Sequence, residues 1–174
     1  MYETIDKKRT ITRIKTNKPD YTFKKAYLEF PEDQFLILTE LDEEEIILSE
    51  RFGEREDYAI INGKTKEDER ERLVDMFIDG KLRILITKPR IIGFGLNLQN
   101  CFRLILYGIS DSYERFYQVI RRCYRRGQLK NVQVYIPITH LESPIMNNIN
   151  LKSDKWEKMI YDQESRYNKL LGEK

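Results

Sequence analysis

Short apolar runs and amphipathic segments alternate along most of this chain. The runs are rich in β-branched, leucine and aromatic residues, and they lie at 35–38, 58–61, 82–87, 102–107 and 132–136. Apolar runs of this length are typical of strands that are buried on both faces. Because helical patterns separate the runs, we predict an α/β fold: a parallel sheet with helices on both faces.

Capping residues and apolar periodicity mark the helices between the strands. Asp42 is a suitable N-cap for a helix that runs through about Phe52 and that Gly53 ends. Thr65 and Asp68 approximate a capping box, and the helix that follows them ends near Gly80. These signals place one helix after each of the first two strands.

The pattern also divides the chain. The predicted parts are a charged N-terminal arm (1–33), an α/β lobe (34–140) and a C-terminal helical extension (141–174). In the arm, the residues at 10–14 alternate like a short strand, and 22–30 is predicted as another strand. In the extension, an apolar stripe predicts a tail helix over 152–171.

Composition restricts the class of protein. Of the 174 residues, 40% are hydrophobic and 34% are charged, which is typical of one globular and highly charged domain. We expect Cys101 and Cys123 to be buried free thiols, and His140 is the only histidine, so no metal site is predicted. No apolar run reaches membrane-spanning length and the first residues do not resemble a signal peptide, so we expect an intracellular protein, cytoplasmic or nuclear, without membrane partners.

An arginine-rich helix is expected after Ser110 and Asp111. Its arginines are Arg121, Arg122, Arg125 and Arg126. At about 100° per residue, Gln118, Arg122 and Arg125 share one narrow face. The other side is broadly apolar and consists of Tyr113, Phe116, Tyr117, Ile120, Cys123 and Tyr124. Guanidinium groups suit forked contact with phosphate oxygens, so the polar face is a candidate site, although the net charge of +2 is too small to indicate nucleic-acid binding by itself.

A glycine loop lies upstream of this helix, where Gly93 and Gly95 allow the backbone to turn or to approach a ligand closely. The loop contains Gly-Phe-Gly-Leu-Asn-Leu-Gln at 93–99, and the helix carries Gln-x-x-x-Arg-x-x-Arg-x-Gly-Gln at 118–128. This pair resembles the second RecA-like lobe of superfamily 2 helicases and fits the Snf-type translocases best. The resemblance covers roughly 34–139, and the two motifs are specific in combination.

The resemblance implies roles for individual residues. Arg122 and Arg125 match the two motif arginines, which stabilise charge on the γ-phosphoryl group of ATP, and an arginine finger is worth about 10³–10⁵ in rate. The residues expected near the nucleotide are Gly95, Asn97 and Gln118. The residues expected on the nucleic-acid backbone are Asn62, Gly63, Thr87, Lys88, Arg90 and Gly93. An ordinary strand-exit turn explains the 62–63 corner equally well, and the loop departs from the Snf-type pattern at Pro89, Ile91 and Ile92.

The chain carries no phosphate-binding P-loop. Gly63, Lys64 and Thr65 imitate the end of one, but Tyr58 occupies the position of the required glycine. The chain therefore has the arginine half of an ATP site, and we expect ATP with Mg²⁺ to be bound mainly by a partner, the N-terminal RecA-like lobe.

The sequence thus predicts the second lobe of an ATP-dependent DNA helicase or translocase, inactive in isolation. Its partners would be nucleic acid, with DNA favoured, and an N-terminal lobe in the same or another chain. The compact form is similar to viral or phage relatives, which would place the protein in a host cell. One alternative stays open, a stand-alone nucleic-acid-binding or regulatory module without ATP turnover. The missing phosphate loop argues against a third interpretation, an α/β nucleotide-binding protein of another kind.

Overall fold

The computed structural model describes residues 16–91, 98–110, 112–124 and 128–155, apart from the side chains at 113 and 116. The elements are α1 (Lys18–Lys24), the π-helix η1 (Lys25–Glu29), β1 (Phe35–Leu38), α2 (Asp42–Phe52), β2 (Tyr58–Ile61), α3 (Glu67–Ile78), β3 (Ile84–Thr87), β4 (Arg103–Leu106), α4 (Tyr113–Cys123) and β5 (Gln133–Tyr135). A further helix occupies 143–155.

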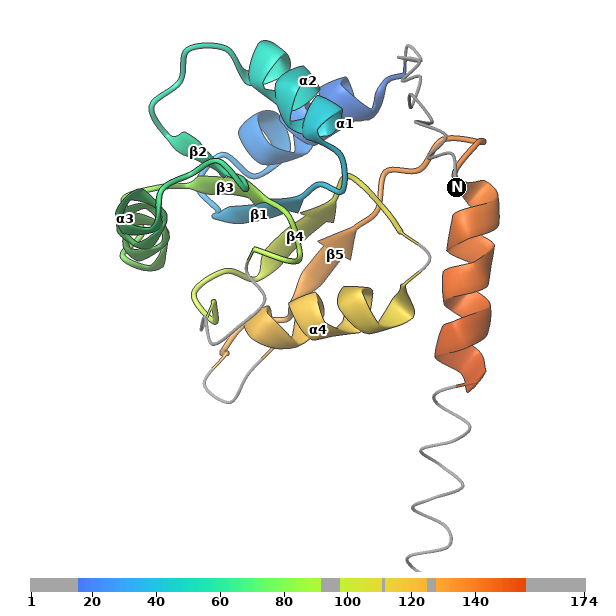
Figure 1. Cartoon of the computed structure of the whole chain (residues 1–174). Coiled ribbons are helices and arrows are strands. Elements are labelled where there is room, and N and C mark those ends of the chain that lie inside the picture. Colours follow the sequence, from blue (N-terminus) through green and yellow to red (C-terminus); the bar gives the residue numbers. More distant parts are fainter. Residues whose placement is uncertain (1–15, 92–97, 111, 125–127, 156–174) are drawn as a thin grey trace, which may run out of the picture.

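All five strands are parallel and lie in the order β2-β3-β1-β4-β5 (Figure 1). Phe35, which opens β1, lies opposite Ile84 on one side and Arg103 on the other, so the central strands begin in register. The predicted strands are confirmed, although β3, β4 and β5 are each shorter than the apolar run that predicts them.

Helices cover both faces of the sheet, as predicted. Along β1, Leu36 and Leu38 belong to the core under α3 and α4, whereas Phe35 and Ile37 belong to the core under α1, η1 and α2. All four side chains are fully buried. Burial of each such side chain contributes about 1.5–3 kcal/mol, so the central strand anchors two hydrophobic layers at once.

Residues 22–29 are helical and Phe30 is the C-cap of η1, so the prediction of a strand over 22–30 was wrong. Phe23, Ala26, Tyr27 and Phe30 follow a spacing of three and four residues, and all of them pack on the core beside α2. Pro19 lies in the first turn of α1, where its missing amide hydrogen costs nothing. The helical period in this segment outweighs the β-propensity of its aromatic residues.

Several helix boundaries also differ from the predictions. The N-cap of α2 is Leu41, so the prediction of Asp42 as its cap was wrong by one residue. The N-cap of α3 is Lys66 and makes no side-chain capping hydrogen bond, while the N-cap of α4 is Ser112, whose Oγ accepts a hydrogen bond from the amide of Arg115. The C-terminal helix begins at 143, nine residues before the predicted start. The expected strand at 10–14 and the rest of the tail helix lie outside the described residues.

Cys101 and Cys123 are free and buried, as expected. A hydrogen bond involving Cys101, together with burial, raises the pKa of Cys123, so its thiol stays protonated. No helix within the described ranges has both the length and the apolar character needed to cross a membrane.

Candidate functional site

Polar side chains from three strand ends converge on Glu45, in the first turn of α2. Thr39 follows β1 and its Oγ1 donates to the Glu45 carboxylate at 3.4 Å. Asn62 follows β2 and its Nδ2 donates to the same carboxylate at 3.3 Å. Lys88 follows β3 and its Nζ lies 3.8 Å from Glu45 Oε1. Glu45 is only 5% exposed, so this carboxylate joins the carboxyl ends of β1, β2 and β3 beneath the surface.

Lys88 is paired with a second carboxylate at the same place. Its Nζ donates to Asp42, the first residue of α2. Partial burial acts to lower the pKa of Lys88, but the hydrogen bond to Asp42 and the charge of Glu45 outweigh it, and the net shift is upward. Lys88 is therefore a fully charged cation held between two acidic side chains.

The corner after β2 is a tight turn organised by Asn62. The side-chain Oδ1 of Asn62 accepts from the backbone amide of Lys64 at 3.0 Å. The backbone amide of Asn62 donates to Thr65 Oγ1 at 3.0 Å. Such side-chain bonds to nearby backbone are typical of Asx and related turns. Gly63 lies exposed at the tip, and the Cβ of a larger residue there would meet open space.

The remaining residues expected on nucleic acid lie at different depths. Thr87 is fully buried, and its carbonyl accepts from the amide of Thr39 at 2.9 Å. Among the described residues, the Thr87 hydroxyl is one of the few buried side-chain oxygens without a hydrogen-bond partner. Arg90 is exposed, and Gly93 lies outside the described residues.

Helix α4 packs on the sheet through Val119 and Cys123. Gln118 lies on an exposed part of the helix and its Nε2 donates to Glu114 at 3.0 Å, while Arg122 is half-buried. Tyr124 is 70% exposed, so its predicted place on the apolar side was wrong: the helix ends at Cys123 and the helical projection no longer applies. Three residues of the expected nucleotide site, Gly95, Asn97 and Arg125, lie outside the described residues.

The two ends of α4 lie near opposite ends of the strands: its first residues near the carboxyl ends and its last residues near the amino ends (Figure 1). At the carboxyl edge, Arg115 lies 3.9 Å from Glu40, which follows β1. At the amino edge, the carbonyl of Arg122 accepts from the amide of Leu98, which precedes β4, at 3.3 Å. Functional residues of parallel α/β sheets commonly lie beyond the carboxyl ends of the strands, and on that rule the arginine helix was expected there with the other candidates. That placement is wrong for Arg122, because a helix that links parallel strands runs back toward their beginnings.

Gln128, the last residue of the arginine motif, joins both motifs. Its Nε2 donates to the carbonyl of Gln99 at 2.7 Å, with longer contacts of 3.4 Å to the carbonyls of Cys101 and Cys123. Its side chain thereby ties the exit of the glycine loop to the end of α4. The motif spacing gives no indication of this contact, because it depends on how the chain returns after 127.

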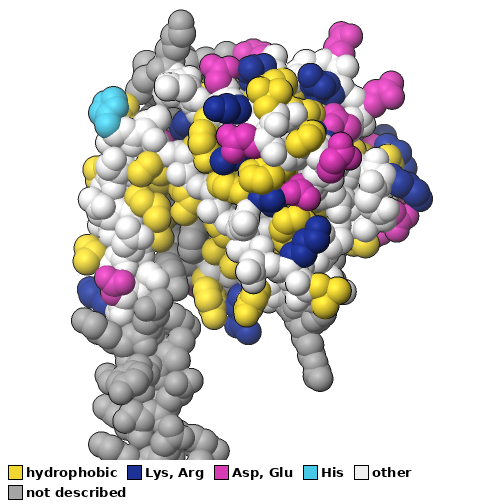
Figure 2. Space-filling model, turned by 180° about the vertical axis from the view of Figure 1, so that it is seen from behind, with side chains coloured by type: hydrophobic (Ala, Val, Ile, Leu, Met, Phe, Trp, Pro, Cys, Tyr) yellow, Lys and Arg dark blue, Asp and Glu magenta, His cyan; other side chains and the backbone are white. Residues whose placement is uncertain are grey.

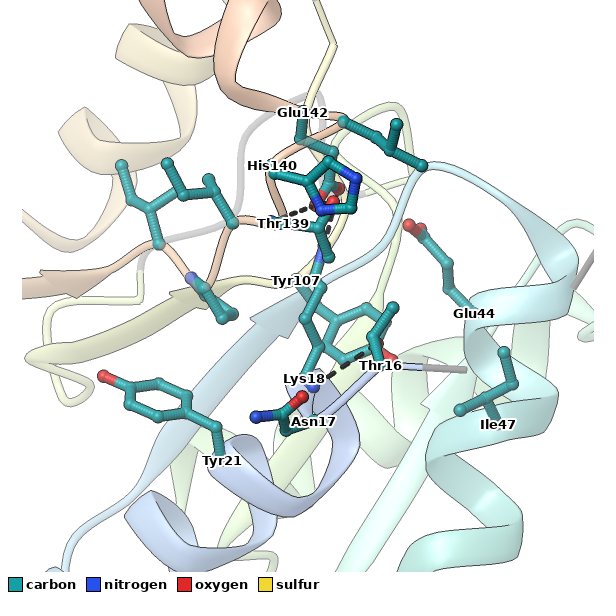
Figure 3. A pocket seen from close by; sticks show the side chains of 14 residues that line it. Thr16, Asn17, Lys18, Tyr21, Glu44, Ile47, Tyr107, Thr139, His140 and Glu142 are labelled. Atoms are coloured by element: carbon teal, nitrogen blue, oxygen red, sulfur yellow. Dashed lines mark hydrogen bonds and ion pairs between the residues drawn. The ribbon is translucent and has the colours of Figure 1, made fainter. Parts of the chain in front are cut away.

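A cavity of about 820 Å³ lies near the carboxyl ends of β4 and β5 (Figure 3). On its wall, Lys18 pairs with Glu142 at 2.6 Å and lies 4.9 Å from the ring centre of Tyr107. Hydrogen bonds from Lys18 and Thr139 outweigh the opposing effect of burial and lower the pKa of Glu142. Sequence analysis missed this pair, since 124 positions separate the two residues.

The buried carboxylate of Glu45 and the half-buried carboxylate of Glu142 should respond oppositely to pH. Burial raises the pKa of Glu45 above its ordinary value of 4.5, despite Lys88 and Asn62. The stability that Glu45 contributes is therefore present below that value and lost as the pH rises. Glu45→Gln should raise the melting temperature at pH 7–8, with the gain vanishing near pH 4.

Glu142 is the control, because its substitution by glutamine should change the melting temperature in the opposite direction. Its pKa is lowered, so its contribution to stability is present above 4.5 and lost as the pH falls. Glu142→Gln should lower the melting temperature at neutral pH. Thermal unfolding of both variants across a pH series measures this, and changes of the same sign at pH 7 would contradict the assignment.

Charges of both signs are interspersed with hydrophobic side chains on the face turned away in Figure 1, as Figure 2 shows. A mixed surface of this kind generates no broad field of one sign. Recognition of a polyanion on this face would therefore depend on particular residues.

Comparison with known proteins identifies the family. The model of the helicase conserved C-terminal domain matches residues 21–127. The chain is 31% identical over 107 residues to the chromatin structure-remodeling complex subunit snf21 of Schizosaccharomyces pombe, covering 59% of this chain and 9% of that protein. It is 30% identical over 98 residues to the helicase SWR1 of Saccharomyces cerevisiae, covering 55% of this chain and 6% of that protein. The chain thus spans less than a tenth of these curated relatives.

Solved structures agree on the fold. The C-terminal part of the Fun30 ATPase domain superposes with a TM-score of 0.64 at 23% identity, covering 84% of this chain and 52% of that one. The C-terminal domain of the DEAD-box protein Dbp5 superposes with a TM-score of 0.62 at 18% identity, covering 78% of each chain. The fold is that of a RecA-like helicase C-terminal lobe, distantly similar to Snf2-type remodelers, and the chain belongs to the helicase conserved C-terminal domain family.

Proposed function

We propose that this chain is the second lobe of an ATP-dependent DNA translocase or helicase. Arg122 and Arg125 stabilise the charge that develops on the γ-phosphoryl group, and Gly95, Asn97 and Gln118 lie against the nucleotide. The N-terminal RecA-like lobe holds the phosphates. DNA is the favoured nucleic acid because one relative is named as a subunit of a chromatin-remodeling complex.

One observation carries the proposal: a single segment connects the two candidate sites. It leaves β3 at Lys88, on the edge where the Glu45 cluster lies, and at Leu98 it is hydrogen-bonded to Arg122. Because the segment is one continuous piece of backbone, a movement of Lys88 at one end can be transmitted to Leu98 at the other. A motor that couples ATP turnover to movement on DNA requires a link of this kind between its nucleotide and nucleic-acid sites.

The residues of this lobe fit the arginine half of an ATP site. Arginine stays charged at any physiological pH and matches phosphate geometry. The described residues contain no cluster of histidine, cysteine and acidic side chains that could hold a metal ion. Mg²⁺, which neutralises phosphate charge when it is bound, is therefore assigned to the partner lobe together with the P-loop.

Nucleic-acid contact is assigned to the carboxyl edge, through the turn at Asn62 and Gly63 and through Thr87, Lys88, Arg90 and Gly93. These are backbone and cationic contacts that read no base edges. Binding by this chain should be weak, independent of sequence and steeply dependent on salt. The protein would act inside the cell, in the cytoplasm or the nucleus.

Lys88→Ala tests this edge. It should weaken binding to all DNA sequences about equally and reduce the slope of log affinity against log salt by about one. Fluorescence anisotropy of labelled DNAs of several sequences, between about 50 and 200 mM salt, measures both quantities.

Lys81→Ala is the matched control, because Lys81 precedes the same strand at the opposite edge and also pairs with an aspartate, Asp79, at 2.9 Å. It should leave the slope unchanged. Equal effects of the two substitutions, or salt-insensitive binding, would contradict the assignment. A strong preference for one sequence would favour the alternative function, a regulatory nucleic-acid-binding module without ATP turnover.

A further inference from the structure

Lys88 belongs to the proposed nucleic-acid edge, and the inference made here rests on that proposed function. In this structure the ammonium group of Lys88 is not open to a phosphate. Its ammonium group is in contact with Asp42 and lies 3.8 Å from Glu45. Its side chain is only 20% exposed. A phosphate that binds Lys88 must therefore compete with these carboxylates for its ammonium group.

The two carboxylates differ in depth. Glu45 is buried and is held by Thr39 and Asn62 as well as by Lys88, so it stays in place when the surface changes. The side chain of Asp42 is 70% exposed. Only Asp42 can swing into solvent without breaking other contacts of the Glu45 cluster.

The position of Asp42 also favours its charge. It is the first residue of α2, and the positive end of the helix dipole stabilises a carboxylate in the first turn. The hydrogen bond from Lys88 lowers the pKa of Asp42 further. The Asp42 carboxylate that contacts Lys88 therefore resembles a phosphate, because it supplies a negative charge and acceptor oxygens at an exposed position.

We propose that Asp42 occupies on Lys88 the place of a nucleic-acid phosphate, so that DNA must displace Asp42 before Lys88 can bind it. Lys88 then exchanges one anionic partner for another and keeps Glu45 as its buried neighbour. The ion pair between Lys88 and Asp42 thus opposes weak or transient binding of DNA. It is broken when the rest of the motor holds DNA in place.

Replacement of Asp42 by a phosphate on Lys88 requires little free energy, so it is reversible. Ion pairs at an exposed carboxylate are weak, and removing one corresponds to a change of about fivefold or less in an equilibrium constant. Removal of Asp42 also takes away its repulsion of the incoming phosphate. Asp42→Asn should therefore tighten DNA binding by about threefold to fivefold at low salt, with the gain shrinking as salt rises.

The control variant is Glu43→Gln, which removes the same charge one residue along the same helical turn. Asp42→Ser is the second test variant, because it removes the same carboxylate. An effect that both variants share cannot come from the asparagine amide. All variants are made in the full chain, and binding of a fluorescein-labelled duplex DNA of mixed sequence is measured by anisotropy.

The decisive comparison repeats Asp42→Asn in the Lys88→Ala background. The tightening should disappear there, because Asp42 acts through Lys88. Tightening of the same size in both backgrounds, or with Glu43→Gln, would show a general charge effect and overturn the inference. No tightening with Asp42→Asn, while Lys88→Ala still weakens binding, overturns the inference alone. No weakening with Lys88→Ala removes the proposed contact and the inference together.

Discussion

Replacing Arg122 or Arg125 with alanine, in a motor that pairs this chain with a matching N-terminal lobe, should lower ATP turnover by about 10³-fold or more. Nucleotide binding should stay largely intact, because an arginine finger acts on charge that appears in the transition state more than on ground-state affinity. Steady-state turnover and nucleotide affinity, measured on the same preparations, separate these two quantities.

Arg121→Ala and Arg126→Ala are the matched controls on the same segment. Arg121 is exposed, and its guanidinium lies 5.5 Å from the ring centre of Tyr117. It points away from the face that Gln118 and Arg122 share on α4. Both controls should retain most of the turnover. If all four substitutions reduced turnover alike, the segment would be a generic basic patch and not a pair of fingers.

The sheet was predictable because its central strands are buried on both faces. A strand such as β1, with all four residues buried, has to be apolar throughout, and this leaves a clear signal in the sequence. The parallel arrangement follows from the helices between the strands. The segment at 22–30 was missed because its aromatic residues suit a strand, while their spacing suits a helix.

The site was less predictable, because its contacts join residues that are distant in sequence. Lys88 could be recognised from its place at a strand end, but its pairing with Asp42, 46 positions away, could not. From the sequence, Asp42 and the acidic residues that follow it were assigned only to the start of a helix. The same residues also supply the carboxylates of the Glu45 cluster, and only the fold brings them to β3.

The position of Arg122 shows a second limit. Helical projection correctly placed Cys123 on the buried side of the helix, because a local period suffices for that. It could not tell which edge of the sheet the last turn of α4 would reach. That depends on the direction in which the helix returns, and the hydrogen bond from Leu98 reveals it.

Taken alone, the chain should hydrolyse ATP at no more than a background rate. On the proposed function it would contribute arginines to the reaction, but the P-loop that would cradle the β- and γ-phosphates is absent from its sequence, with Tyr58 in the place of the first glycine. Transition-state stabilisation requires a nucleotide held in register with the fingers, and effective molarities for such positioning are large. The expected difference between the single lobe and the paired lobes is therefore several orders of magnitude.

The most direct test of the account is ATP turnover by the purified chain, with and without duplex DNA, before and after addition of a matching N-terminal RecA-like lobe that carries a P-loop. We predict background turnover for the chain alone, and DNA-stimulated turnover for the pair that is lost with Arg122→Ala. Robust DNA-stimulated turnover that follows the isolated monomeric chain through purification would contradict the claim that this lobe supplies only half of an ATP site.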